Sequence, residues 1–336
     1  MWGVLRNAVV LVALSALILA GAKAWIYYIS PATDLTRTVG DSNQTQQQID
    51  RCVNQGNIVT PDDSINGCTA AIQSGRWSGQ DLAAVFLDRG KAYANKGDLD
   101  RAIADFNEAI RLNPNDADAA ATAKYNRGGA YQAKGDLDRA IADFSEAIRL
   151  DPKFPGAYNN RGNTYQAKGD LDRAIADFDE AIRLNPNDAA VGATYWGNAY
   201  SYANRGAAYA GKGDLDRAIA DFDEAIRLDP KFPGAYFNRG SAYQAKSDFD
   251  RAIADFSEAI RLNPKFPSAY YNRGSTYQVK GDLDRAIADF NEAIRLNPKF
   301  ADAYYHRGKA YADQGDLDRG LADLNEGIRR VEESRP

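Results

Sequence analysis

The sequence is poor in the residues that most often carry chemistry: its 336 residues include one histidine, two cysteines and one methionine. These offer too few nitrogen and sulfur ligands for a zinc site, and no nucleophile elbow, phosphate-binding loop or metal-ligand spacing occurs. There is no block of basic residues and the formal net charge is −5, which disfavours nucleic-acid binding. The sequence therefore predicts a protein that is not an enzyme and needs no cofactor or metal.

Long apolar runs are absent except near the N-terminus. There, Arg6 precedes the apolar run Val9–Ala20, and Ala22–Ala24 has the small-x-small pattern of a signal-peptide cleavage site. We expect residues 1–24 to be a signal peptide, the alternative being an uncleaved membrane anchor that extends to Ile29. In a bacterial cell both interpretations predict export, either to the periplasm or to the periplasmic face of the inner membrane. The polar residues 30–45 are predicted to be a linker.

One glycine recurs through most of the chain, at Gly90, Gly128, Gly162, Gly206, Gly240, Gly274 and Gly308. The intervals are 38, 34, 44, 34, 34 and 34 residues. Around each glycine, apolar residues have helical spacing, and a Gly-Asp turn separates a first helix from a second. The glycine is expected to let the two helices approach closely, with alanines such as Ala174 and Ala181 opposite it. The basic interval of 34 residues predicts a repeated antiparallel helix pair.

The repeat resembles the tetratricopeptide repeat (TPR) family through Tyr158, Gly162, Tyr165, Ala174, Phe178, Ala181, Pro186 and their equivalents. This resemblance implies an all-α, right-handed superhelical solenoid of antiparallel helix pairs. About seven repeats would occupy residues 83–334, and a degenerate repeat would occupy residues 46–80. Four extra residues near Ala117–Ala120 are predicted to lengthen one first helix by about a turn.

One regular departure from the family concerns an arginine in each first helix, at the position where a large apolar residue is usual. Each second helix carries an equally regular aspartate. We interpret Arg161 with Asp177, and their equivalents, as a ladder of structural ion pairs between neighbouring helices.

Cys52 and Cys68 fall on facing helices of the degenerate repeat when it is aligned with the others. In an oxidising compartment they are predicted to form a disulfide, worth about 3 kcal/mol in the chain-entropy model. Redox catalysis is the alternative, although the pair lacks Cys-x-x-Cys spacing.

The resemblance also implies a function, because in TPR proteins the first helices line a concave surface that holds peptide segments or helices of other proteins. The candidate groove residues are Tyr125, Asn159, Asn163, Gln166, Phe237, Gln244, Tyr271, Gln278 and Tyr305. The aromatic ones could instead pack against the adjacent repeat. In the insertion around residues 189–198, Tyr195 and Trp196 could contact a partner or pack beneath an extended helix.

The last repeat supports a second hypothesis, self-association. Gly320 and Gly327 replace alanines, Leu324 replaces a phenylalanine, and no separate polar capping helix follows. Such an end could dock on an envelope partner or on another copy, which would make the protein a homo-oligomeric assembly element of the cell envelope. The charged run Arg329–Arg335 could equally act as a cap. The predicted function is a non-enzymatic protein-interaction scaffold, with homo-oligomeric assembly as the alternative.

Overall fold

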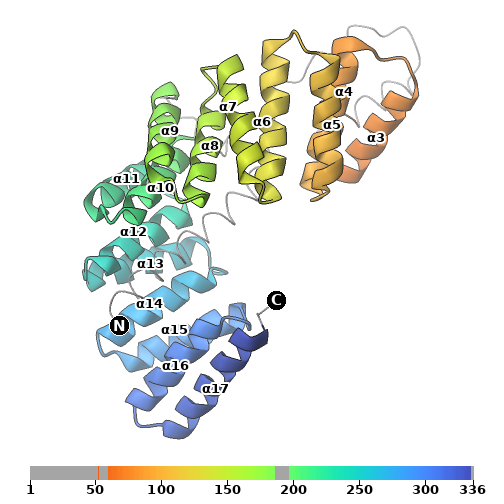
Figure 1. Ribbon diagram of the computed structural model, residues 1–336. Coiled ribbons are helices and arrows are strands. Elements are labelled where there is room, and N and C mark those ends of the chain that lie inside the picture. Colours follow the sequence, from red (N-terminus) through yellow and green to blue (C-terminus); the bar gives the residue numbers. More distant parts are fainter. Residues whose placement is uncertain (1–51, 53–59, 186–196, 334–336) are drawn as a thin grey trace. The chain divides into compact units, whose positions relative to one another are not determined.

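The computed structural model describes residue 52, residues 60–185 and residues 197–333 (Figure 1). The predicted signal peptide or anchor, the linker and the insertion residues Tyr195 and Trp196 lie outside this part of the chain. Within it, all regular structure is helical, in fifteen helices labelled α3 to α17. None of the described helices is both long enough and apolar enough to cross a membrane.

The described residues fall into two compact units that divide between Ser201 and Tyr202. The first unit contains α3 (Pro61–Gln73), α4 (Gly79–Asn95), α5 (Leu99–Leu112), α6 (Ala117–Ala133), α7 (Leu137–Leu150), α8 (Pro155–Ala167) and α9 (Leu171–Leu184). Each helix packs on the next along the chain. The predicted all-helical array of consecutive helix pairs is confirmed here. The first full repeat begins with α4 at Gly79, and α6 has 17 residues where α8 has 13, which confirms the predicted extra turn.

The second unit contains most of α10 (Asn198–Gly211) and the helices α11 (Leu215–Leu228), α12 (Pro233–Ala245), α13 (Phe249–Leu262), α14 (Pro267–Val279), α15 (Leu283–Leu296), α16 (Ala301–Asp313) and α17 (Leu317–Glu333). From α11 onward each helix again packs on the next. The helix pairs of both units therefore share one plan.

The turn inside each pair follows from two residues. Gly169 has φ +81°, a left-handed conformation that glycine adopts at little cost, and it ends α8. Asp170 then caps α9, because its side chain accepts a hydrogen bond from the backbone N–H of Arg173 at 3.1 Å. The Gly-Asp sequence thus reverses the chain within a few residues.

A phenylalanine of the second helix fills the space over the glycine of the first helix. Phe178 is fully buried, and a Cβ added to Gly162 would lie 2.7 Å from its Cε1 atom. The phenylalanine ring therefore leaves no room for a side chain at this glycine. The same arrangement recurs at Gly90, Gly128, Gly206, Gly240 and Gly274. At Gly206 the helices also approach closely, because an added Cβ would lie 3.1 Å from the backbone oxygen of Ala218, the equivalent of Ala174.

Candidate functional site: the first-helix surface and the contacts between repeats

The predicted arginine–aspartate ladder is confirmed. Arg161 of α8 donates to Asp177 of α9 through Nε at 2.8 Å and through Nη2 at 2.7 Å, a paired geometry that fits a guanidinium to a carboxylate. Burial raises the pKa of the Asp177 carboxyl, and the hydrogen bonds from Arg161 oppose this rise. Equivalent pairs are Arg89–Asp105, Arg127–Asp143, Arg205–Asp221, Arg239–Asp255, Arg273–Asp289 and Arg307–Asp323.

The remaining guanidinium nitrogen of the ladder arginine reaches the preceding repeat. Arg161 donates through Nη1 to the Ser145 hydroxyl of α7 at 3.0 Å. Corresponding bonds join Arg127 to Asn107, Arg239 to Asp223, Arg273 to Ser257 and Arg307 to Asn291. One arginine therefore connects three helices, because all three of its guanidinium nitrogens donate hydrogen bonds to neighbouring helices. We conclude that the ladder is structural.

A second link between repeats lies at the exposed helix ends. The ammonium group of Lys168, just after α8, forms an ion pair with Asp138 in the first turn of α7. Equivalent ion pairs join Lys96 to Asp62, Lys134 to Asp100, Lys246 to Asp216 and Lys280 to Asp250. In the last repeat a glutamine replaces the lysine, and Gln314 donates a hydrogen bond to Asp284. In each of these cases a repeat presents a basic or amide donor to an acidic residue of the repeat before it.

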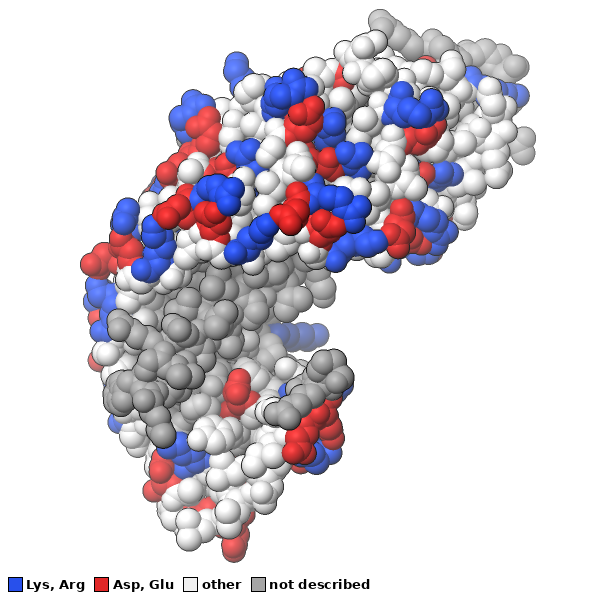
Figure 2. Space-filling model, viewed as in Figure 1, with Lys and Arg blue, Asp and Glu red and all other residues white. Residues whose placement is uncertain are grey.

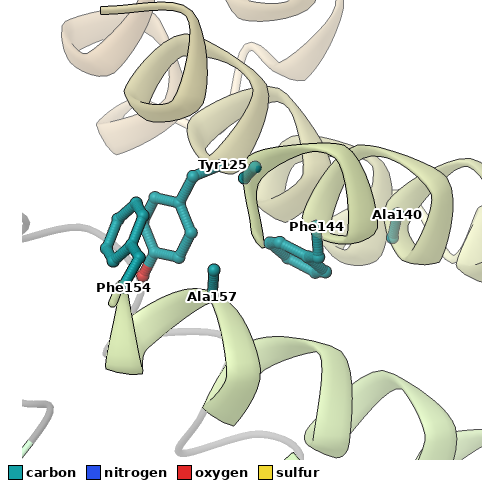
Figure 3. Close-up of a cluster of buried hydrophobic side chains, with 6 residues drawn as sticks. Tyr125, Ala140, Phe144, Phe154 and Ala157 are labelled. Atoms are coloured by element: carbon teal, nitrogen blue, oxygen red, sulfur yellow. The ribbon is translucent and has the colours of Figure 1, made fainter. Parts of the chain in front are cut away.

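Two of the predicted groove aromatics lie inside the array. Tyr125 is fully buried, with its ring centroid 4.7 Å from that of Phe154 and 5.8 Å from that of Phe144 (Figure 3). Phe237 has the same surroundings, 4.8 Å from Phe266 and 5.8 Å from Phe256. Neither residue has surface to offer a partner. These two assignments are corrected to packing residues between repeats, the alternative that the sequence had left open.

Tyr271 packs similarly, with its ring centroid 4.9 Å from that of Phe300, which precedes the next repeat. Tyr271 is partly buried and packs against the core cluster that contains Phe290, and this burial raises the pKa of its hydroxyl. Asn159 is buried as well and leaves the candidate surface. Tyr305, in the last repeat, is different because 53% of it is exposed.

The remaining candidates are carboxamides on first helices, which we call the amide row: Asn163 and Gln166 on α8 in the first unit, and Gln244 and Gln278 on α12 and α14 in the second. All four are partly exposed. Gln278 is occupied by the next repeat, since its Oε1 lies 3.2 Å from Nδ1 of His306 and its Nε2 donates to the His306 carbonyl oxygen at 3.4 Å. Gln244 Oε1 is a buried atom without a partner among the described residues. The hydrogen-bonding capacity open to a partner is therefore that of Asn163 and Gln166 on α8, which are partly exposed and whose side chains bond no described residue.

The lone histidine is part of the packing between α14 and α16. Its ring lies edge-on to Tyr271, with centroids 5.4 Å apart, and burial lowers its pKa. His306 thus replaces the buried asparagine of other repeats, such as Asn272. Among the described residues no group of three or more His, Cys, Asp or Glu side chains could hold a metal ion.

The two cysteines form a disulfide in the structure. Both are buried, and Ala71, Val85 and Trp77 pack around them. The bond ties residue 52 to α3, at the start of the array.

Comparisons with known proteins identify the class to which this array belongs. Family models described as "TPR repeat" and "Tetratricopeptide repeat" match residues 83–116, 128–169, 155–188, 206–247, 233–266, 256–288, 279–315 and 301–330. Together they cover more than half of the sequence. The chain belongs to the tetratricopeptide repeat family, whose members are protein-interaction scaffolds. No curated protein matches it.

Solved structures share the fold. A tetratricopeptide repeat protein from Parabacteroides merdae has 21% identity and a TM-score of 0.57, over 74% of this chain and 93% of that one. Yeast Tom70 has 18% identity and a TM-score of 0.56, over 94% of this chain and 67% of that one. A chain of the APC/C hetero-tetramer Cut9-Hcn1 has 18% identity and a TM-score of 0.59, over 85% of this chain and about half (52%) of that one. At these identities the likeness shows the fold alone.

Proposed function

We propose that this protein is a non-enzymatic scaffold whose first helices bind an extended segment of a partner protein. The observation that carries the proposal is the amide row, in which partly exposed, uncharged carboxamides recur on the first helices α8, α12 and α14. A carboxamide both donates and accepts hydrogen bonds, so it can pair with the N–H and C=O groups of an extended backbone. Such a surface would bind peptide main chain with limited dependence on sequence.

The distribution of charge supports a protein partner over a nucleic acid. Exposed second-helix arginines are paired with neighbouring carboxylates, as Arg183 is with Glu180 and Arg261 with Glu258. Figure 2 shows basic and acidic groups intermixed over the described face in view, without a patch of one sign. Because the amide row is uncharged, peptide binding there is expected to depend only weakly on salt.

The test uses peptides selected by display against the full chain. The double variant Asn163→Ala/Gln166→Ala removes two amides one turn apart on α8 and is expected to weaken binding about tenfold, since each lost hydrogen bond costs roughly 0.5–1.5 kcal/mol. Fluorescence anisotropy measures the affinity and circular dichroism checks the helicity. Arg183→Ala, in the second helix of the same repeat, is the matched control and should bind like the parent. Equal affinity for the double variant would refute the proposal.

We propose further that the protein is exported, in line with the N-terminal signal or anchor sequence. The Cys52–Cys68 disulfide supports this proposal because such bonds persist in oxidising compartments. In intact cells the two thiols are expected to resist alkylation unless a reductant is added first. Rapid alkylation of both thiols without reductant would argue for a reducing compartment.

A further inference from the structure

The end of the second unit exposes a contiguous set of large apolar side chains. Leu317, Leu321 and Ile328 of α17 are 63%, 60% and 59% exposed, and Tyr305 of α16 is 53% exposed. In α15, thirty-four residues earlier, the equivalent residues Leu283, Ile287 and Ile294 are half-buried. We call the surface formed by Tyr305, Leu317, Leu321 and Ile328, with Asp318 and Asn325, the terminal face.

The terminal face continues the interface that joins one repeat to the next. In the preceding repeat, Leu283 and Ile287 pack with Ala310 of α16, a first helix. Tyr271, the equivalent of Tyr305, is covered by Phe300 and His306 of the following repeat. The terminal face therefore has the apolar residues that contact the next first helix in the preceding repeat, but no described helix covers it.

Two polar side chains on the terminal face indicate which donor groups a helix covering this face would carry. Asp318 is equivalent to Asp284 and Asp250, which accept from Gln314 and Lys280 of the following repeat. Asn325 is equivalent to Asn291 and Ser257, which accept from the ladder arginines Arg307 and Arg273. The side chains of Asp318 and Asn325 make no hydrogen bond or ion pair with any described residue. In both links, the following repeat supplies the donor.

We propose that the terminal face binds an amphipathic helix of a partner protein, with an arginine and a lysine seven residues apart and small residues facing the leucines. Arg273 and Lys280 show the required spacing within the array. The arginine would donate to Asn325, the lysine would pair with Asp318, and the apolar side chains would be removed from water. This surface is separate from the amide row and does not depend on that proposed function.

A second copy of the chain fits this face less well. Asp318, Asn325 and Glu332 follow one another at intervals of seven residues along one edge of α17. Two α17 helices packed antiparallel through their apolar faces would bring Asp318 of one copy near Glu332 of the other, and like charges repel. A basic helix meets the same edge with complementary charge.

The test uses the full chain and a labelled peptide with the sequence of residues 267–280. A hydrocarbon staple on the face away from Arg273 and Lys280 holds the peptide helical, as circular dichroism must verify. Fluorescence anisotropy is expected to show saturable binding that Leu321→Ser/Ile328→Ser weakens at least about tenfold. Asp318→Asn should weaken it several-fold and reduce its salt dependence. The peptide with both basic residues changed to glutamine is the matched control and should bind poorly.

The variant Asn163→Ala/Gln166→Ala should bind this peptide normally, which separates the terminal face from the amide row. A verified helical peptide that does not bind, or that binds Leu321→Ser/Ile328→Ser as tightly as the parent, would overturn the proposal. So would light scattering that shows a dimer of the parent and a monomer of Leu321→Ser/Ile328→Ser, because the face would then be covered by a second copy.

Discussion

Phe178→Ala is expected to destabilise the array by about 3–5 kcal/mol, the range for removing a fully buried phenylalanine ring. The ring fills the space over Gly162, and a glycine has no side chain with which to close the resulting cavity. Because repeats are stabilised by their neighbours, the loss should be largest in α8 and α9 and in the helices that contact them. Urea unfolding measures the total change, and hydrogen exchange resolves its location.

The matched control for this prediction is Leu324→Ala, at the equivalent position of the last repeat. Leu324 is only half-buried in the structure, so its truncation is expected to cost clearly less than that of Phe178. Similar losses at the two positions would contradict the account of the core, because burial would then not determine the cost.

The helix pairs could be predicted from the sequence because their signals are local and repeated. Gly169 and Asp170 mark a helix end and a helix start within two residues, and the structure has both. The extra turn of α6 also follows from counting four inserted residues between two recurring glycines. Repetition makes such signals secure, since each copy tests the interpretation of the others.

The positions of the groove aromatics could not be predicted in the same way. Tyr125 and Tyr305 occupy equivalent positions in their repeats, yet one is fully buried and the other is 53% exposed. The difference comes from Phe154, in the turn before the following repeat, whose ring covers Tyr125. A contact between side chains in different repeats has no signature in the spacing of either helix, although the recurring Lys-Phe-Pro turns were a signal that could have suggested it.

The ladder was partly predictable for a related reason. Arg161 and Asp177 could be paired because both recur once in each repeat. The third contact, from Arg161 to Ser145, was not predicted, because serine, asparagine and aspartate alternate at the accepting position. Only the acceptor function is shared there, and a side-chain oxygen is all that the guanidinium requires.

Asp177→Ala is expected to destabilise the array by roughly 3 kcal/mol, the low end of the range for breaking a buried ion pair. The substitution leaves the Arg161 guanidinium without its main partner, but 19% of that side chain is exposed, and solvent compensates part of the loss. Arg161→Leu, which restores the apolar residue usual in the family, leaves Asp177 buried without its partner. The double variant Arg161→Leu/Asp177→Leu should recover most of the stability, since an apolar pair carries no cost of desolvating charges.

The pH dependence of Arg161→Leu distinguishes this account from a simple loss of packing. Burial raises the pKa of Asp177, and removing the opposing arginine raises that pKa further. Between the unfolded and folded pKa values the folded chain binds more protons, so the free energy of unfolding falls as pH rises. The penalty of Arg161→Leu, relative to the parent, should therefore shrink as pH falls from 7 towards about 4, whereas that of the double variant should change little across this range. Urea unfolding at several pH values measures the penalties of the single and the double variant. If the penalty of Arg161→Leu did not depend on pH, and the double-mutant cycle showed no coupling, the ion pair would not stabilise the array.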